Sequence, residues 1–519
     1  MALATPAPYF TSPTGKQAIY FYTNWSAYDR KFYPKSLPLD KLTDIAYAFF
    51  NVDATGRVYS GDEWADYQMP LNGKGEGVDP QNKWDSPPDQ LGLLGQFLKL
   101  KKQGHKFNMH ASVGGWSWSG NFSPAVSTSE NRERFVSTLA GIMNRYPGLF
   151  NSISLDWEYL SNNGENYGLG GNAANKDDAN NFIKLLKLIR QKLPGFKISM
   201  CTSAAPEKWM FPAKQISELL DEVHMMTYDF LDGAWGQGGP ASGHHTNLTK
   251  SPYVPYSTDD AAKAMLKLGV EPKKIFIGVA FYSRGFSGTD GLGKPYTGGS
   301  TDRTWDNGSV DYNKLPLPGS TEMWDPVANA AYSYDAKKRV LNSYDEPRSV
   351  KLKCDYVHNN NLGGILIWEA SADHVFDHPR SLMKVMYENL THGGGGKPTP
   401  PEPTPPEPTP PEPTPPKPTP PKPTPPKPTP PKPTPPKPTP PKPTPPKPTP
   451  PKPSPPKPTP PKPTPPKPTP PKTTPPTTPT DGITGVDGEP FFYNAGIKMN
   501  CPTGLVWNSA ANACDWPKK

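Results

Sequence analysis

The chain has 519 residues, of which 75 are proline, and its formal net charge at pH 7 is +8. Residues 397–480 alone hold 13 lysines against three glutamates, so this stretch carries +10 and the rest of the chain is near −2. A globular part without a basic surplus argues against a nucleic-acid partner. Because no apolar run reaches 18 residues, we also expect no membrane partner.

Composition divides the chain into four parts. Residues 1–16 form an N-terminal extension, and residues 17–391 are long enough for one large domain. Residues 392–480, which repeat KPTPP or EPTPP, predict a disordered Pro/Thr/Lys-rich linker of extended, polyproline II character. Its lysines either keep the linker open by mutual repulsion or attract it to an anionic surface. Residues 481–519 are too few to fold without help.

Eight short β-rich runs alternate with helical patterns along the large domain. The runs span residues 16–25, 43–52, 106–115, 150–159, 196–206, 222–230, 274–286 and 362–369, and amphipathic stretches at 131–146 and 179–193 predict helices between them. Eight strands alternating with helices predict an α/β fold, the (β/α)8 TIM barrel. The interval 287–348 is too long for a loop and predicts a small α+β insertion between strands seven and eight.

Polar and aromatic side chains recur where these strands end. They are Ser112 and Trp116 after the third strand, Asp156 and Glu158 on the fourth, Tyr228 and Asp229 on the sixth, Tyr282 and Arg284 on the seventh, and Trp368 on the eighth. The carboxyl ends of barrel strands form the active site of such folds. Carboxyl groups act on glycosidic bonds as acids and bases, and aromatic faces stack on sugar rings. We therefore expect a carbohydrate-active site.

Five motifs occupy these strand ends. They are SVGGW (112–116), LDWEY (155–159), MTYDF (226–230), FYSRGF (281–286) and GGILIW (363–368). Together, and in this order, they resemble the signature strands of glycoside hydrolase family 18, the chitinases and their relatives, from about residue 17 to residue 390. The resemblance implies hydrolysis of the β-1,4 linkages of chitin, with retention of configuration and with the substrate's N-acetyl group in place of an enzymic nucleophile.

The resemblance also implies a role for each site residue. Glu158 would be the general acid and base, Asp156 would orient the acetamido N–H of the substrate, and Tyr228 would hold the acetamido oxygen. The residues implied in sugar binding are Trp116, Met226, Asp229, Trp235, Tyr282, Arg284 and Trp368. No cofactor is expected, since the chain shows no P-loop and no dinucleotide fingerprint. No metal is expected either, because HVFDH (374–378) lacks the glutamate of the zinc-protease motif.

The fourth strand departs from the family pattern. The family reads Asp-Gly-x-Asp before the final Asp-x-Glu, whereas this chain has Asn151, Ser152 and Ser154. Without a carboxylate at position 154, we expect Asp156 to ionise more readily, because no adjacent like charge shares its proton. Ser112 and Ser154 should then offer Asp156 neutral hydrogen bonds only. We expect an active enzyme with a lower rate or an altered pH optimum.

The C-terminal segment carries a second resemblance. EPFFYNAGIKMNCPTGLVWNSAANACDWP (489–517) resembles the second half of a peritrophin-type chitin-binding module, although such modules usually carry six cysteines. The resemblance implies sugar stacking by Tyr493, Trp507 and Trp516, and the pair Cys501 and Cys514 suits a disulfide in a small β-rich module. Cys201 and Cys354 lie far apart in the large domain and are expected to be free and buried.

Two other functions remain open at this point. One is a chitin-binding, lectin-like protein with vestigial activity, and the other is an endo-β-N-acetylglucosaminidase acting on N-glycans. Endo or exo cleavage would depend on how the insertion and the loops near Trp64 and Trp84 close the cleft. We expect a monomer that acts at an extracellular or cell-wall site. The start MALATPAPYFTSPTGKQ does not resemble a signal peptide, so export by a nonclassical route, or release at lysis as for a viral protein, would be required.

Overall fold

A computed structural model describes residues 5–233 and 238–393, together with the backbone of five short strands near the C-terminus. The chain divides into two compact units, residues 1–411 and 412–519. No helix among the described residues is long and apolar enough to cross a membrane. The linker, apart from its first two residues, and the side chain of Trp235 lie outside the described residues.

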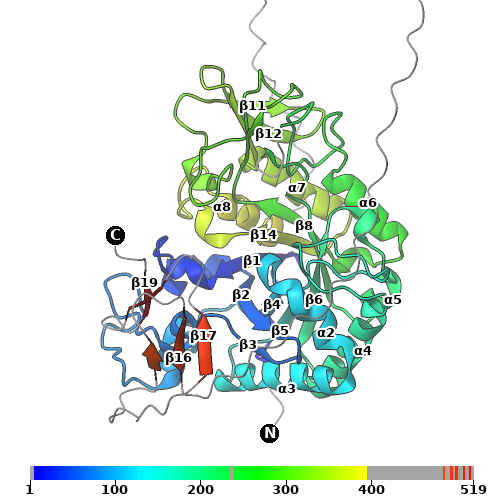
Figure 1. Ribbon diagram of the computed structural model, residues 1–519. Helices are drawn as coiled ribbons and strands as arrows, with labels where there is room; N and C mark the ends of the chain where they lie inside the picture. Colours follow the sequence, from blue (N-terminus) through cyan, green and yellow to red (C-terminus); the bar gives the residue numbers. More distant parts are fainter. Residues whose placement is uncertain are drawn as a thin grey trace, which may run out of the picture. The chain divides into compact units, whose positions relative to one another are not determined.

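Eight parallel strands close the predicted barrel (Figure 1). They are β1 (Gln17–Thr23), β2 (Asp44–Val52), β4 (Asn108–Gly114), β5 (Ser152–Asp156), β6 (Lys197–Ser203), β7 (Glu222–Met226), β8 (Ile275–Ala280) and β14 (Gly364–Trp368). Pairing of β1 with both β2 and β14 closes the ring, and the short β3 (Val58–Ser60) is antiparallel to β2. The prediction of a (β/α)8 barrel is therefore confirmed.

Helices cover the outer face of the barrel. They are α1 (Gly92–Lys102), α2 (Phe122–Ser127), α3 (Ser129–Arg145), α4 (Asp178–Lys192), α5 (Ala213–Ser217), α6 (Thr258–Lys267), α7 (Pro347–Asn359) and α8 (Leu382–Met386). The side chains of Thr128 and Ser257 cap α3 and α6 by accepting backbone N–H groups of the first turn. Helices α3 and α4 contain the two predicted amphipathic stretches, whose apolar residues are buried against the strands.

Successive residues of β5 face opposite sides of the barrel wall. Ile153, Leu155 and Trp157 pack outward in the main hydrophobic core, where the indole of Trp157 stacks on Phe122 at 5.2 Å between ring centroids. The alternate residues, among them Ser154, face inward and are fully buried. This alternation places the acidic end of the strand inside the barrel mouth.

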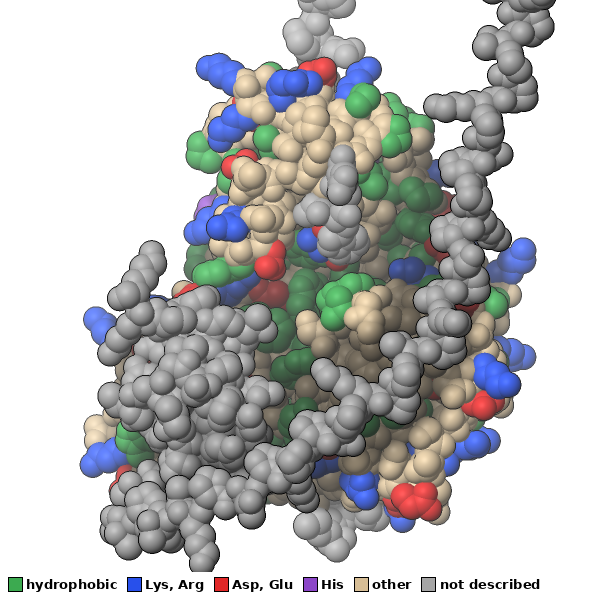
Figure 2. Space-filling view, in the orientation of Figure 1, with side chains coloured by type: hydrophobic (Ala, Val, Ile, Leu, Met, Phe, Trp, Pro, Cys, Tyr) green, Lys and Arg blue, Asp and Glu red, His purple; other side chains and the backbone are tan. Residues whose placement is uncertain are grey.

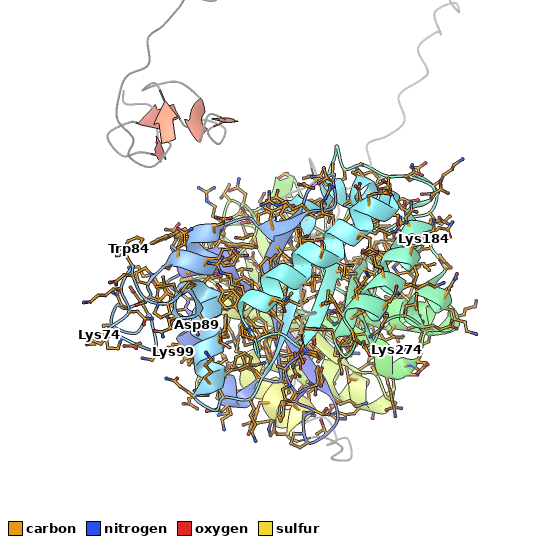
Figure 3. All side chains as sticks on the ribbon, turned by 90° about the horizontal axis from the view of Figure 1, so that it is seen from below. Lys74, Trp84, Asp89, Lys99, Lys184 and Lys274 are labelled. Atoms are coloured by element: carbon orange, nitrogen blue, oxygen red, sulfur yellow. The ribbon has the colours of Figure 1, made fainter. Side chains whose placement is uncertain are left out.

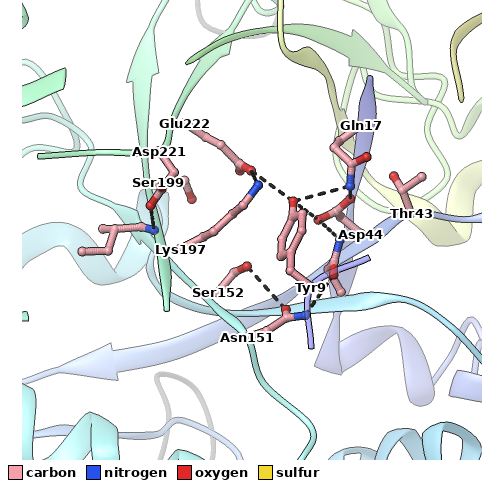
Figure 4. A network of polar contacts seen from close by, with 12 residues as sticks. Tyr9, Gln17, Thr43, Asp44, Asn151, Ser152, Lys197, Ser199, Asp221 and Glu222 are labelled. Carbon is pink, nitrogen blue, oxygen red and sulfur yellow. Dashed lines mark hydrogen bonds and ion pairs between the residues drawn. The ribbon is translucent and has the colours of Figure 1, made fainter. Parts of the chain in front are cut away.

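A buried polar network closes the amino-terminal end of the barrel (Figure 4). Asp44 accepts hydrogen bonds from the hydroxyl of Tyr9 (3.0 Å) and from the side-chain amide of Gln17 (2.6 Å). Asn151 donates to the side-chain oxygen of Asn108 (2.9 Å) in the same network. Asn151 therefore supports the base of the barrel, at the opposite end of β5 from Asp156.

An antiparallel sheet of five strands is inserted between β8 and β14. Its strands are β9 (Arg284–Ser287), β10 (Gly298–Gly299), β11 (Thr321–Asp325), β12 (Ala330–Asp335) and β13 (Val340–Tyr344), in the order β10-β9-β13-β12-β11. Behind it, the ammonium of Lys353 on α7 contacts the carboxylate of Asp345 (2.7 Å) and the carbonyl oxygen of Gly278 (3.1 Å). This buried ion pair ties the end of the inserted sheet to β8.

The loop between η4 (Trp64–Gln68) and α1 lies at the edge of the barrel, where Figure 3 shows Lys74 and Trp84. The indole of Trp84 is 72% exposed and lies 4.7 Å from that of Trp64 between ring centroids. Salt bridges of Asp79 with Lys99 (2.7 Å) and of Asp89 with Lys102 (3.0 Å) attach the loop to α1. The exposed indole of Trp84 is therefore held on an anchored loop, against the half-buried indole of Trp64.

The second unit contains two small antiparallel sheets. The first consists of β15 (Ile483–Gly485), β16 (Phe491–Asn494) and β17 (Ile497–Asn500), and the second of β18 (Val506–Asn508) and β19 (Ala513–Asp515). The side chains of the predicted sugar-stacking residues and of the predicted disulfide are not among those described. They are Tyr493, Trp507, Trp516, Cys501 and Cys514. Those five assignments stay predictions.

Cys201 and Cys354, in the barrel domain, are free and buried, as predicted.

Candidate active site

A cleft of about 760 Å³ opens where the barrel strands end. Of the predicted site residues, it is lined by Trp116, Asp156, Glu158, Met226, Tyr228, Asp229, Arg284 and Trp368. Tyr282 lies behind this wall, with its hydroxyl on Asp229 (2.8 Å). Figure 2 shows hydrophobic side chains gathered in a hollow of the surface below the inserted sheet. The fold thus brings together residues from five motifs that are up to 252 positions apart, from Trp116 to Trp368.

Asp156 and Glu158 lie at the base of the cleft and are 3% and 8% exposed. The backbone N–H of Glu158 donates to the hydroxyl oxygen of Ser119 (2.8 Å). That hydroxyl donates in turn to the carbonyl oxygen of Gly115 (2.9 Å), and the carbonyl oxygen of Asp156 lies 3.2 Å away. Ser119, on the 3-10 helix η6 (Trp116–Asn121), therefore holds the peptide of Glu158 against the turn after β4. The sequence-based analysis missed this residue.

The two carboxyl groups retain protons at unusually high pH. Burial raises the pKa of Asp156 to about 7, and a hydrogen bond from Cys201 opposes this rise. Burial, and then the charge of Asp156, raise the pKa of Glu158 well above its ordinary value, while a hydrogen bond from Tyr159 lowers it. Carboxyl groups that interact in this way titrate as a pair. Near neutral pH the pair can hold a proton for delivery to a leaving group.

The hydrogen bonds that Ser112 and Ser154 were expected to offer Asp156 are not found in the described part of the chain, whereas easier ionisation of Asp156 relative to a chain with a carboxylate at position 154 stays a prediction. The hydroxyl of Ser112 and the Oδ1 atom of Asp156 find no hydrogen-bond partner within the described part of the chain, and the hydroxyl of Ser154 contacts the thiol of Cys201 rather than Asp156. Both serines are fully buried, so the carboxylate at position 156 gains neither solvation nor the expected hydrogen bonds. A neighbouring negative charge is absent from position 154, yet desolvation outweighs this and keeps the pKa high.

Tyr228 lies beside the two carboxyl groups and is 9% exposed. Burial raises its pKa well above the ordinary value, so its hydroxyl stays protonated and can donate a hydrogen bond. The ring of Tyr228 meets that of Tyr282 edge-on at 6.2 Å between centroids. Tyr228 is thus held as a neutral donor in the wall of the cleft.

Arg284 forms ion pairs with two aspartates in the wall of the cleft. Its guanidinium contacts Asp229 through Nε (2.7 Å) and Asp232 through Nη1 (3.0 Å). Burial alone would raise the pKa of Asp229, but Arg284 and a hydrogen bond from His245 hold it well below its usual value. Asp229 is therefore ionised beside a pair of carboxyl groups that retain protons.

Aromatic rings form one surface of the cleft around Trp368. The indole of Trp368 stacks on Phe49 (5.8 Å between centroids, 19° between planes) and approaches Phe21 (5.5 Å) and Trp25 (6.3 Å). Trp116 is 43% exposed and Trp25 is 44% exposed, so both indoles are free to meet a ligand. Phe49 and Trp25 were not predicted, although Phe49 lies near the end of β2 and Trp25 lies two residues after β1.

Several known proteins are similar to this chain in sequence or in fold. The family described as Glycosyl hydrolases family 18 matches residues 17–373. Endochitinase 1 of Metarhizium robertsii (strain ARSEF 23 / ATCC MYA-3075) is 34% identical over 395 residues, which cover 72% of this chain and 86% of that protein. The chitinase of Autographa californica nuclear polyhedrosis virus is 28% identical over 402 residues, 68% of this chain and 69% of that protein.

Among solved structures, the catalytic domain of psychrophilic chitinase B from Arthrobacter TAD20 superimposes with a TM-score of 0.65 at 27% sequence identity. The match covers 75% of this chain and all of that domain. The matched family spans the barrel strands and the paired carboxyl groups alike. This chain belongs to the glycosyl hydrolases of family 18.

Proposed function

We propose that the protein hydrolyses β-1,4 linkages between N-acetylglucosamine units of chitin by substrate-assisted, retaining catalysis. The observation that carries this proposal is the buried pair Asp156 and Glu158 at the base of an aromatic cleft. In this scheme the N-acetyl group of the substrate is the nucleophile, so a second enzymic carboxylate is not needed for attack. The similarity to chitinases of fungal, viral and bacterial origin supports chitin as the substrate.

Glu158 acts first as an acid and then as a base. The carbonyl oxygen of the acetamido group attacks the anomeric carbon, the glycosidic C–O bond breaks, and the leaving oxygen takes the proton of Glu158. Water then attacks the anomeric carbon, the bond between this carbon and the acetamido oxygen breaks to restore the acetamido group, and the water gives a proton to the Glu158 carboxylate, which restores the acid. The raised pKa of Glu158 supports this role, because the carboxyl group keeps its proton at neutral pH.

Asp156 and Tyr228 position the reacting acetamido group. The carboxylate of Asp156 accepts the acetamido N–H and stabilises the positive charge of the oxazolinium ion. The neutral hydroxyl of Tyr228 donates to the acetamido oxygen and holds it near the anomeric carbon. Asp156 has to be ionised for this task, and burial raises its pKa to about 7, so we expect activity to rise as the pH approaches neutrality.

The remaining cleft residues bind sugar in this proposal. Trp368 forms the floor of the cleavage site with Phe49 beneath it, and Trp116 and Trp235 line the track of the polymer. Met226, Asp229 and Arg284 complete the wall, and Tyr282 supports Asp229 from behind it. The ionised Asp229 accepts hydrogen bonds from sugar hydroxyls in this proposal.

Two further roles rest on the sequence alone. The C-terminal residues 481–519 bind insoluble chitin, and the linker tethers the barrel to that surface. Deletion of residues 481–519 should lower adsorption to insoluble chitin and leave cleavage of soluble oligomers unchanged; unaltered adsorption would remove this role. The site of action is polymer outside the producing cell.

Reducing-sugar release and product analysis on a chitin hexamer test the function directly. Wild-type protein should cleave the hexamer, and Glu158→Gln should lower the rate at least about 100-fold, because an amide can neither donate nor accept the proton. Glu165→Gln is the matched control, since Glu165 is exposed in the loop that follows. Equal background rates for wild type and Glu158→Gln would favour the lectin-like alternative, and cleavage of N-glycans alone would favour an endo-β-N-acetylglucosaminidase.

A further inference from the structure

The carboxylate of Asp156 is almost without polar support inside the barrel. Its Oδ1 atom has no hydrogen-bond partner among the described residues, and the nearby hydroxyl of Ser112 is likewise unpaired there, whereas the hydroxyl of Ser154 contacts the thiol of Cys201. The parallel register places Ser112 directly beside Ser154 on the adjacent strand, and Gly114 beside Asp156. On this side of the carboxylate, β4 contributes no charged group.

The strand on the other side brings a thiol to Asp156. Leu155 of β5 pairs with Met200 of β6 in parallel register, so Asp156 and Cys201 are the next residues on the two strands. Leu155 and Met200 pack in the outer core, whereas Cys201 belongs to the inner cluster that contains Tyr228. Cys201 therefore faces the barrel interior on the same side as Asp156. It is free and 1% exposed.

We propose that Cys201 is a positioning residue for the glycosidase reaction, whose thiol donates a hydrogen bond to the Asp156 carboxylate and fixes its orientation. The inference rests on the proposed function, because it assigns to Asp156 the task of accepting the acetamido N–H. The hydrogen bond of Cys201 is also the contact that moderates the raised pKa of Asp156. Burial raises the pKa of Cys201 itself well above its ordinary value, so the thiol keeps its proton and acts as a donor.

The donor strength of position 201 should set the acidic limb of the activity profile. A thiol is a weak donor, a hydroxyl is a stronger one, and an alanine offers none. The other titratable groups around the Asp156 carboxyl are Glu158, Tyr159, Lys208, Tyr228 and Asp229. All five are unchanged by a substitution at position 201, so a shift of the acidic limb reports the contact between the thiol and Asp156.

The experiment compares kcat/KM against pH for wild type, Cys201→Ala and Cys201→Ser on a soluble chitin oligomer. Cys201→Ala should move the acidic limb up by about half to one pH unit, because the ionised form of Asp156 loses a donor. Cys201→Ser should restore the limb or move it below that of wild type. The matched control is Cys354→Ala, since Cys354 is a free, fully buried cysteine on α7 outside the cleft lining.

Thermal stability measured against pH gives a readout that does not depend on activity. The stability lost in Cys201→Ala should grow as the pH rises through 7, where Asp156 becomes ionised, whereas the loss in Cys354→Ala should be independent of pH. An unshifted acidic limb in an active Cys201→Ala variant would overturn the proposal, as would a stability loss independent of pH. If wild type does not cleave chitin oligomers, the proposed function fails, and the stability series still decides whether Cys201 bonds Asp156.

Discussion

Replacement of Ser119 by alanine should slow catalysis although the hydroxyl lies outside the cleft lining. Ser119 is fully buried and accepts the backbone N–H of Glu158 at 2.8 Å. Without the hydroxyl, this N–H loses its partner, which costs about 1–3 kcal/mol for a buried donor. If the full cost falls on the geometry required in the transition state, kcat decreases by about 5- to 150-fold. KM should change little, because Ser119 does not line the cleft.

The assay measures kcat, KM and thermal stability for Ser119→Ala and for the matched variant Ser123→Ala. Ser123 is also a buried serine, and its hydroxyl donates to the carboxylate of Asp178 at 2.8 Å. Both variants should lose stability by a similar amount, whereas only Ser119→Ala should lose kcat. A wild-type kcat for Ser119→Ala, or an equal loss of kcat in both variants, would refute a positioning role for Ser119.

Two further predictions concern stability. Lys353→Met leaves the buried Asp345 without its counter-ion and should cost about 3–5 kcal/mol. Lys351→Met breaks only the exposed pair with Asp355 and should cost less than about 1 kcal/mol, so equal shifts of the urea midpoints would contradict this contrast. For Glu222, burial alone would raise the pKa, but His224, His110 and Lys197 lower it from 4.5 to about 2. Its ionisation therefore stabilises the fold above pH 4.5, and this contribution is lost as the pH falls towards 2. Glu222→Gln should show a shallower loss of melting temperature between pH 6 and 3, and a slope as steep as that of wild type would speak against it.

The barrel could be predicted because the pattern of each strand is local. Each of the eight runs places apolar residues at the spacing of a strand, and helical patterns lie between several of them. The site could be predicted in part for a related reason. Strand ends in this fold converge, so the motifs that contain Asp156, Tyr228 and Trp368 had to meet. Trp25, two residues after β1, follows the same rule, whereas Phe49 precedes the end of β2 by three residues.

Ser119 and Cys201 could not be found in this way. Ser119 reaches the peptide of Glu158 only because η6 folds back over the end of β5. The contact of Cys201 with Asp156 depends on the register between β5 and β6, which neither strand specifies by itself. The raised pKa of Asp156 could not be predicted for the same reason, because the sequence does not show the burial of its carboxyl group.

Periodicity and motif order predict the fold class, the family and the carboxyl pair, because both can be read without knowledge of contacts. The protonation of that pair depends on the folded barrel. Asp156 is 3% exposed with one oxygen unpaired among the described residues, and the free energy of ionising a group depends on the water and hydrogen bonds that packing leaves to it. Whether Asp156 and Glu158 hold a proton at neutral pH is therefore set by what the barrel packs around them.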